Sequence, residues 1–383
     1  MTNIVNVFEK AFTVSPDDIF SCGGRFEILG NHTDHNHGLC LAATCNLAIT
    51  AAVKRRNDLN VTMMSVGYRP FSINLYHLEP QEDEKNSSCA LVRGIAYYLC
   101  KHGYRIGGFD AASVSTIFAG AGVSSSAAFE LLIAQIFNDY FNEGKIDKMV
   151  LCKAGQFAEN NYFGKKSGLL DQIGVGYGNI VSIDFKNIEK PIVSQVKFPF
   201  DDLHFVIVNT GGSHAELSDL YSAIPEDMKN AAAKCGHKFL REGSMDEIVA
   251  HRDQLLEMEY NRALHFYSEN ERVLAALDAI KYEDEQLFLD SINGSRMSST
   301  YYLKNMMVED EYKGSPLEAC DLAMEIMNNE GACKINGGGF AGSIICVVPS
   351  RHLENFIEQM SEKYGKDNVC EVSVRTNGPI KEE

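Results

Sequence analysis

Residues 120–127 have the composition of a loop that holds phosphate. They read Gly-Ala-Gly-Val-Ser-Ser-Ser-Ala and lie between an expected strand and an expected helix. Small residues allow a phosphate to approach the backbone, and amides at a helix N-terminus offer donors and partial positive charge. A strand-to-helix turn with a serine N-cap would have the same composition. No Gly-Lys-Ser or Gly-Lys-Thr occurs, which excludes a Walker A loop. The candidate phosphate contacts are Gly120, Ala121, Gly122, Val123, Ser124, Ser125, Ser126 and Ala127.

Residues 23–38 gather one arginine, two acidic residues and three histidines. Their glycine and asparagine content predicts a loop. A metal site is one reading, but His32, Asp34, His35 and His37 lack the i, i+4 spacing of a helical zinc pair. Recognition of a polyhydroxylated ligand fits better, because a carboxylate accepts from hydroxyls and an imidazole donates to one.

The stretch 336–342 reads Asn-Gly-Gly-Gly-Phe-Ala-Gly and formally matches G-x-G-x-x-G. A dinucleotide-binding loop requires a helix after these glycines, whereas the apolar run 343–348 predicts a strand. A glycine-rich wall that closes on a ligand remains, and a plain turn is the alternative. The wall would consist of Gly337, Gly338 and Gly339.

Two acidic residues complete the set of candidates. Glu159 lies on an expected helix over 150–162, and Asp171 follows in a loop flanked by glycine. Taken alone, each reads as a solvated surface acid, which is the usual environment of Asp and Glu.

The elements that must position these residues alternate between strands and helices, which predicts an α+β or α/β fold. The helix after the serines carries an apolar stripe from Phe129 to Tyr140 at 3,4 spacing and has a stop at Gly144. The stretch 217–305 reads as mainly helical. Pro191 and Pro199 interrupt the pattern and suggest a boundary near 185–200. The expected strands are 46–55 and 61–66, joined by a turn at 56–58, then 111–117, 179–184, 203–209, 343–348 and 370–374.

Composition excludes several classes of protein. The net charge of −17 over 383 residues argues against a nucleic-acid partner. The sequence contains no run of roughly 18 apolar residues, which is the length that a membrane helix needs. The N-terminus also lacks a secretion signal. The 11 cysteines contain no Cys-x-x-Cys, which favours reduced thiols and a cytoplasmic protein.

Together the motifs resemble the galactokinase branch of the GHMP kinases. That family carries a signature close to G-R-V-N-L-I-G-E-H-T-D-Y-N-G-G, and here Gly24–Gly38 reads GRFEILGNHTDHNHG. Its phosphate loop, close to P-x-G-x-G-L-S-S-S-A, matches FAGAGVSSSA at 118–127. Its third motif matches GGGFAGS at 337–343, and its M-D-Q triplet matches Leu170-Asp171-Gln172. All motifs occur in the family order, across essentially the whole chain.

The resemblance implies a fold with two domains and a cleft in which nucleotide and sugar meet. The N-terminal domain, residues 1–190, would be ribosomal-protein-like α/β, and the C-terminal domain, residues 191–383, ferredoxin-like α+β. The implied activity is transfer of the γ-phosphoryl of ATP to the 1-hydroxyl of galactose, with Mg²⁺, by a monomer.

The resemblance also assigns roles to individual positions. Asp171 matches the base, or electrostatic partner, of the sugar hydroxyl, and Arg25 matches the arginine beside it. Ser126 and Glu159 match the ligands of Mg²⁺, a hard cation that binds few carboxylates plus phosphates. The positions that match sugar contacts are Asn31, His32, Asp34, Tyr221 and Asp171.

Departures from the family pattern leave the sugar open. The glutamate before His-Thr-Asp, which faces the C6 hydroxyl in galactokinases, is Asn31 here, so a C6-modified galactose such as galacturonate is an alternative substrate. Other departures are Phe118, His35 and the pair Ser222-Ala223. A non-catalytic sugar sensor of the same fold is the alternative from another class. The complete serine run and Asp171 argue against it.

Overall fold

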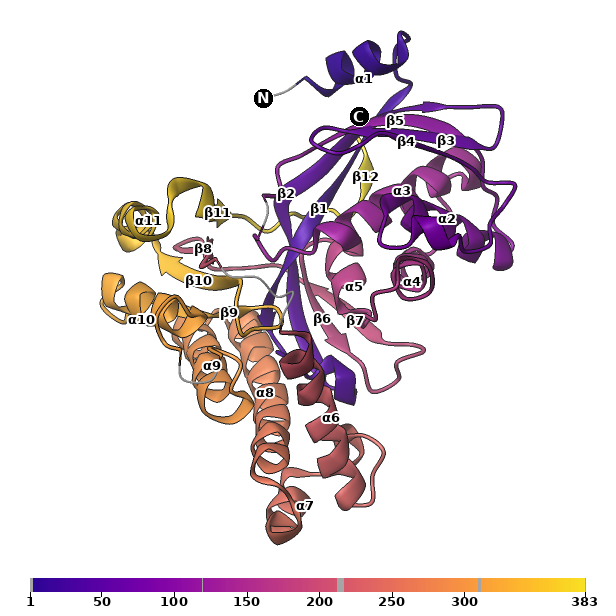
Figure 1. Cartoon of the computed structure of the whole chain (residues 1–383). Coiled ribbons are helices and arrows are strands. Elements are labelled where there is room, and N and C mark those ends of the chain that lie inside the picture. The colour runs from indigo at the N-terminus through magenta and orange to yellow at the C-terminus, as the bar shows by residue number, and fades with distance from the viewer. Residues whose placement is uncertain (1–2, 119, 212–216, 309–310, 383) are drawn as a thin grey trace.

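A computed structural model describes residues 3–118, 120–211, 217–308 and 311–382, and these ranges form two sheets with helices packed on them (Figure 1). The larger sheet has eight strands within these ranges, in the order β12-β1-β2-β5-β3-β4, with β6 on β2 and β7 on β6. Its strands are β1 (Asp18–Leu29), β2 (Leu39–Arg55), β3 (Asn60–Ser65), β4 (Phe71–Asn74), β5 (Phe109–Ser115), β6 (Ile180–Asp184), β7 (Ile192–Val196) and β12 (Ile380–Lys381).

Strand β1 serves two hydrophobic cores because a bulge reverses its faces. Its pairing with β2 is antiparallel, and the register shifts between Gly23 and Arg25. Before the bulge, Phe20 packs in the core beneath the N-terminal helices. After it, Phe26 packs in a core shared with the second sheet. Residues an even number of positions apart share a face in a regular strand, so the irregularity between Phe20 and Phe26 places them on opposite faces. Strand β1 thereby connects the two halves of the molecule.

The N-terminal helices cover the larger sheet and deliver the phosphate loop. The apolar stripe predicted after the serines forms α3, whose buried face includes Leu132, Ile133, Ile136 and Phe137. Its C-cap is Glu143, and Gly144 follows with a φ of 68°. The helices of this half are α1 (Ile4–Phe12), α2 (Ser88–Lys101), α3 (Ser125–Asn142), α4 (Lys148–Ala158) and α5 (Leu170–Gly176), with a π-helical turn η3 (Glu159–Phe163) between the last two.

The smaller sheet has the order β11-β8-β10-β9, and all its neighbouring strands are antiparallel. Helices α10 and α11 pack on it, and α6 to α9 extend below it in Figure 1. The strands are β8 (Leu203–Asn209), β9 (Ala332–Asn336), β10 (Ser343–Pro349) and β11 (Val369–Val372). The helices are α6 (Ser218–Lys234), α7 (Met245–Ala250), α8 (Glu257–Tyr282), α9 (Glu285–Ser298), α10 (Pro316–Ile326) and α11 (Ser350–Tyr364).

Two expectations from the sequence need correction. Residues 23–38 are not all loop, because the stretch up to Leu29 belongs to β1. Asp171 lies in the first turn of α5 instead of a loop. The predicted turn at 56–58 does join β2 to β3, and these two strands lie on either side of β5.

The division at 190/191 remains a proposal about domains. Strand β7 pairs with β6 across this point, and β12 returns to pair with β1. Sheet membership therefore suggests a boundary after Val196, with the last strand belonging to the first half. Within the described ranges, no helix is long and apolar enough to cross a membrane.

Candidate active site

Two adjoining cavities lie where β1, the phosphate loop and the β9–β10 loop meet. The larger, of about 620 Å³, is lined by the sugar-signature residues and Tyr221, and its volume is that of a small-molecule site. The smaller, of about 280 Å³, is lined by the phosphate loop. Five residues line both cavities and so mark their junction: Arg25, Lys165, Asp171, Gly337 and Gly338.

Asp171 is held at this junction by partners on both carboxylate oxygens. Arg25 donates to Oδ1 through Nε at 2.9 Å and Nη2 at 2.7 Å. The Ser124 hydroxyl donates to Oδ2 at 2.7 Å. Burial favours the neutral acid, but the Arg25 charge and the Ser124 hydrogen bond outweigh it, so the pKa of Asp171 lies below its usual value. The carboxylate is therefore ionised at neutral pH.

The phosphate loop is anchored through its carbonyl groups. Arg25 Nη1 donates to the Gly122 carbonyl at 2.8 Å, and the Ser343 hydroxyl donates to the Ala121 carbonyl at 3.0 Å. The Asn336 amide donates to both carbonyls at 3.3 Å. Gly122 has a φ of 69°, and a Cβ there would lie 2.3 Å from Ser343 Oγ. Because α3 begins at Ser125, the first amides of the helix lack intrahelical partners and can receive phosphate.

Glu159 and Ser126, the proposed magnesium ligands, are in contact. The Ser126 hydroxyl donates to Glu159 Oε1 at 3.3 Å, and Glu159 lies in the π-helical turn η3. Lys165 donates to the same oxygen at 2.9 Å, and Ser167 donates to Oε2 at 2.6 Å. Within the described parts of the chain, no group of three or more His, Cys, Asp and Glu is placed to hold a metal. A cation here would need phosphate oxygens as further ligands.

His32 lines the larger cavity as a neutral ring. Its Nε2 lies 2.8 Å from the Gly338 carbonyl, which can only accept, so Nε2 carries the proton. Its Nδ1 is buried without a hydrogen-bond partner within the described residues. Burial, reinforced by His35, lowers the pKa of His32 to about 3, so the ring is neutral. The ring's one N–H group is used by Gly338, so the donor role toward a ligand that the sequence predicted is already taken.

Asn31 also lines this cavity, but both of its N–H groups are used by the protein. Its Nδ2 donates to Glu27 Oε1 at 2.9 Å and to the Gly337 carbonyl at 2.7 Å. Its Oδ1 accepts from Asn305 at 2.8 Å. Glu27 also accepts from Lys334, a fully buried ammonium, at 2.8 Å. Glu27 is thus a carboxylate of the cavity wall that the sequence reading did not identify.

Tyr221 and Asp34 complete the wall. The Tyr221 ring lies 5.0 Å from the His32 ring and against Gly338, where a Cβ would come within 2.0 Å of it. Asp34 accepts from the backbone amide of His35 at 2.9 Å, next to Gly168. His37 stacks on Phe239 at 3.8 Å, and it is not among the residues that line the cavity.

Residues 30–38, which connect β1 to β2 and which we call the sugar loop, are supported by helix α8. The α8 residues that do so belong to no recognisable sequence motif. Glu269 accepts from the amides of Gly30 at 3.0 Å and Asn31 at 3.3 Å, and from Arg272 at 2.8 Å. Burial opposes ionisation, but Arg272 outweighs it and lowers the pKa of Glu269 to about 2. His265 contacts the Asn31 carbonyl at 2.9 Å. Glu269 and His265 are identified only by their contacts with Gly30 and Asn31 in the folded chain, because they are distant from these residues in the sequence.

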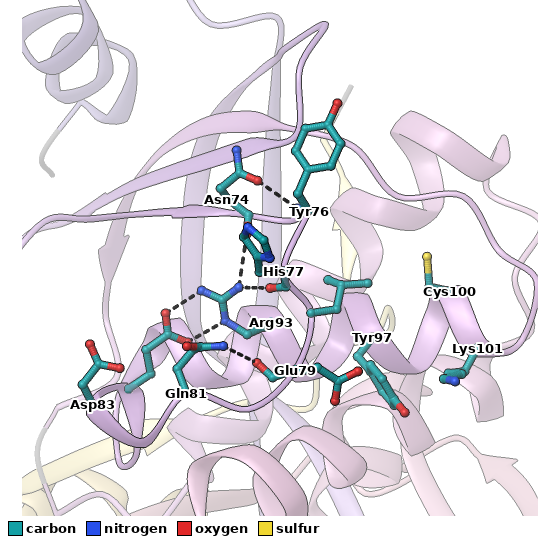
Figure 2. Close-up of a pocket in the computed structure, with 12 residues that line it drawn as sticks. Asn74, Tyr76, His77, Glu79, Gln81, Asp83, Arg93, Tyr97, Cys100 and Lys101 are labelled. Atoms are coloured by element: carbon teal, nitrogen blue, oxygen red, sulfur yellow. Dashed lines mark hydrogen bonds and ion pairs between the residues drawn. The ribbon is translucent and has the colours of Figure 1, made fainter.

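A separate hollow of about 690 Å³ lies between the 75–87 segment and α2 (Figure 2). Its buried cation, Arg93, is already paired: it donates to both oxygens of Glu84 and to the carbonyls of Asn74 and His77. These bonds fasten the segment to α2. They indicate that Arg93 has a structural role, and we assign the chemistry to the two cavities described above.

Comparisons with known proteins find galactokinases and other GHMP kinases. A family model described as the galactokinase galactose-binding signature matches residues 6–55, and one described as the GHMP kinases N-terminal domain matches residues 90–179. The galactokinase of Limosilactobacillus reuteri (strain DSM 20016) is 27% identical over 374 residues, covering 93% of this chain and 92% of that protein. The galactokinase of Exiguobacterium sibiricum is 29% identical over 370 residues, covering 94% and 91%.

Solved structures support the fold. The galactokinase of Lactococcus lactis, determined with galactose, has a TM-score of 0.84 at 24% identity and covers 99% of this chain and 98% of that one. The mevalonate kinase of Methanococcus jannaschii has a TM-score of 0.64 at 14% identity, covering 93% and 98%.

The two-sheet fold is that of the GHMP kinases, and the family model of their N-terminal domain matches the part of the chain that holds the phosphate loop and Asp171. The galactose-binding signature matches β1 and β2, and galactokinases that are 27–29% identical match nearly the full length of this chain.

Proposed function

We propose that the protein transfers the γ-phosphoryl group of ATP to the 1-hydroxyl of galactose. The observation that carries this proposal is the position of Asp171, ionised between Arg25 and Ser124, where the cavity of the sugar signature joins that of the phosphate loop. A hydroxyl bound in the larger cavity would thus meet a phosphoryl group held in the smaller one.

The chain's own residues supply positioning and charge stabilisation, which is what phosphoryl transfer requires. The amides at the start of α3 hold the phosphates, and Asp171 accepts a hydrogen bond from the sugar hydroxyl. The proton passes to Asp171 Oδ2 as the hydroxyl oxygen bonds to phosphorus. Because Arg25 keeps the pKa of Asp171 low, this carboxylate is a weak base, so we propose that the proton moves after the bond to ADP has largely broken.

We propose that Mg²⁺ is held by Ser126 and Glu159 together with phosphate oxygens. A hydroxyl and a carboxylate in contact are hard oxygen donors of the kind this ion prefers. When bound, the ion would neutralise charge on the phosphates. Lys165 now occupies Glu159 Oε1, so this oxygen would have to exchange one cation for another.

The contacts of Asn31 favour a neutral sugar. A C6 carboxylate would need a donor, yet both Asn31 N–H groups are used by Glu27 and Gly337. Glu27 would repel such a group, and a neutral hydroxyl could donate to it. Galactose is therefore preferred over galacturonate. The complete phosphate loop and the paired Asp171 also favour an enzyme over a sugar sensor.

We further propose a monomer that acts in the cytoplasm. The sugar signature, the phosphate loop and Asp171 line two adjoining cavities within one copy of the chain, so a single copy can carry the proposed site. All cysteines are unpaired, which suits a reducing compartment.

A direct assay tests the proposed activity. ATP consumption is measured with galactose, galacturonate, glucose and no sugar, and the position of the phosphate in the product is determined by ³¹P NMR. We expect galactose 1-phosphate and ADP in equal amounts. ATP consumption that is the same with and without every sugar would refute the proposal.

A further inference from the structure

Lys165 is a cation at the junction of the two cavities that the chemistry above does not use. It lines both the larger and the smaller cavity, and its ammonium lies 2.9 Å from Glu159 Oε1. Its side chain is 56% exposed, so the ammonium can move. Its backbone is fixed, because its N–H donates to the Glu159 carbonyl at 3.1 Å.

Arg25, the other cation at the junction, is held in place by its partners. Its Nε and Nη2 donate to Asp171, and its Nη1 donates to the Gly122 carbonyl. These bonds use three of the five N–H groups of the guanidinium, and the Arg25 side chain is only 8% exposed. The ammonium of Lys165 has one acceptor among the described residues, and its side chain is exposed enough to move. Lys165 is therefore the cation at the junction that can turn toward an anion between the cavities.

The arrangement of acidic groups supports the same assignment. A phosphoryl group at the junction would lie near the carboxylates of Asp171 and Glu159, which would repel its charge. The ammonium of Lys165, which contacts Glu159 and lines both cavities, is placed to offset this repulsion.

We propose that Lys165 is a catalytic residue that binds the γ-phosphoryl group of ATP during transfer. When nucleotide binds, the ammonium leaves Glu159 and donates to a non-bridging oxygen of that group, while Glu159 becomes free for the metal that accompanies the phosphates. No bond to Lys165 forms or breaks. This inference rests on the proposed kinase activity and adds a residue that the sequence motifs do not contain.

Binding of ATP and ADP without sugar tests the contact independently of turnover. The affinities of both nucleotides, with magnesium, are measured by titration calorimetry for the wild type, Lys165→Met and Lys165→Arg. We expect Lys165→Met to weaken ATP about 10- to 100-fold, the equivalent of roughly 1.4–2.8 kcal/mol, and to change ADP less than about twofold. Lys165→Arg should keep most of the preference for ATP.

Kinetics supply the second readout. With galactose, kcat of Lys165→Met should fall about 10- to 100-fold while the KM for galactose stays within about threefold, as expected for a contact stronger in the transition state. The matched control is Lys145→Met. This exposed lysine also pairs with a glutamate, Glu143, and it lines neither cavity.

Three outcomes would overturn the proposal. An equal loss of ATP and ADP affinity would show that Lys165 only supports the loop. If Lys165→Met leaves the ratio of ATP affinity to ADP affinity unchanged and lowers the magnesium requirement, the lysine merely competes with the metal at Glu159. If both this ratio and kcat are unchanged, Lys165 takes no part in the reaction. If no sugar is phosphorylated, the proposed function fails, yet the ATP/ADP ratio still decides whether Lys165 meets the γ-phosphate.

Discussion

At the scale of single residues, the site depends on a carboxylate that two neighbours keep ionised. Asp171 receives Arg25 on one oxygen and Ser124 on the other. Asp171→Asn keeps the size of the side chain but removes the charge and the proton acceptor. We expect kcat to fall about 10²–10⁴-fold, the usual contribution of a positioned base. Galactose binding by calorimetry should stay within a few-fold, and a near-normal kcat would contradict the assignment.

The pH dependence of kcat/KM tests the low pKa of Asp171. Since this pKa lies below the ordinary 3.8, the carboxylate loses its charge only in strong acid, and activity should not decline from about pH 8 to about pH 5 through this group. Ser124→Ala removes a hydrogen bond to the charged form, so the pKa rises and the acid limb moves to higher pH. Ser125→Ala, one residue along the loop, serves as the control and should leave unchanged the pH at which kcat/KM falls on the acid side. If that pH is also unchanged in Ser124→Ala, the protonation of Asp171 does not determine it.

Glu27 and Asn31 exchange residue types relative to the family signature, which has asparagine and then glutamate at these positions. Here Glu27 pairs with buried Lys334 and with Asn31. Asn31→Glu alone sets two carboxylates beside one ammonium, and Glu27→Asn alone strips Lys334 of its counter-charge. Each should cost about 3–5 kcal/mol of unfolding free energy. The double variant restores one carboxylate and should recover most of this loss.

Urea unfolding of the four proteins gives the coupling energy directly. The same variants answer the substrate question, because KM for galactose and galacturonate can be compared wherever the protein folds. Additive losses in the double variant would show that the two positions do not share one charge.

The motif residues could be predicted from the sequence, but their partners could not. Arg25, Asp171 and Ser124 come from three separate stretches that the motifs identify. Lys334, Glu269 and Lys165 look like ordinary surface charges in a one-dimensional reading, since most Lys and Glu are exposed. Their roles arise from contacts between distant segments, such as Lys334 with Glu27.

At the scale of elements, the sugar loop is shaped by a helix from the other half of the chain. Glu269 on α8 accepts from two loop amides. Glu269→Gln replaces one carboxylate oxygen with an NH₂ group, which cannot accept from the loop amides or from Arg272. It also removes the negative charge that pairs with Arg272. We expect KM for galactose to rise about tenfold and unfolding free energy to fall by about 3 kcal/mol. Glu271→Gln, exposed on the same helix, is the control, and equal behaviour of the two variants would contradict the role.

Element types followed from periodicity where a single face was apolar, as for α3. Strand β1 did not, because its Gly23-Gly24 bulge breaks the alternation and its residues are buried on both faces. Local composition read this stretch as loop, and the pairing with β2 overrides that preference. Asp171 was misplaced for a similar reason: the glycines of α5 lower helix propensity, and packing against Arg25 and Ala42 overrides it.

At the scale of the whole molecule, both sheets share one core. Phe26 of β1 and Phe205 of β8 pack at 4.7 Å between ring centroids. We therefore expect a single unfolding transition rather than two. Saturating ligand at about 100 times its Kd should add roughly 2.7 kcal/mol and raise the transition by a few degrees. The chain has no tryptophan, so calorimetry or circular dichroism is the measurement, and two separated transitions would contradict the shared core.

The position of β5 between β2 and β3 has a consequence for how the chain folds. Phe109 pairs with Arg55 on one side and Val61 on the other, although these two residues are joined by a short turn. The turn cannot close into a hairpin. Strands β2 and β3 must stay apart until β5, which follows α2 in the chain, is inserted between them. The sheet is complete only when β12 pairs with β1. Such late, non-local pairing slows folding and leaves strand edges open during synthesis, so a nascent N-terminal half would depend on protection from aggregation until the rest of the chain emerges.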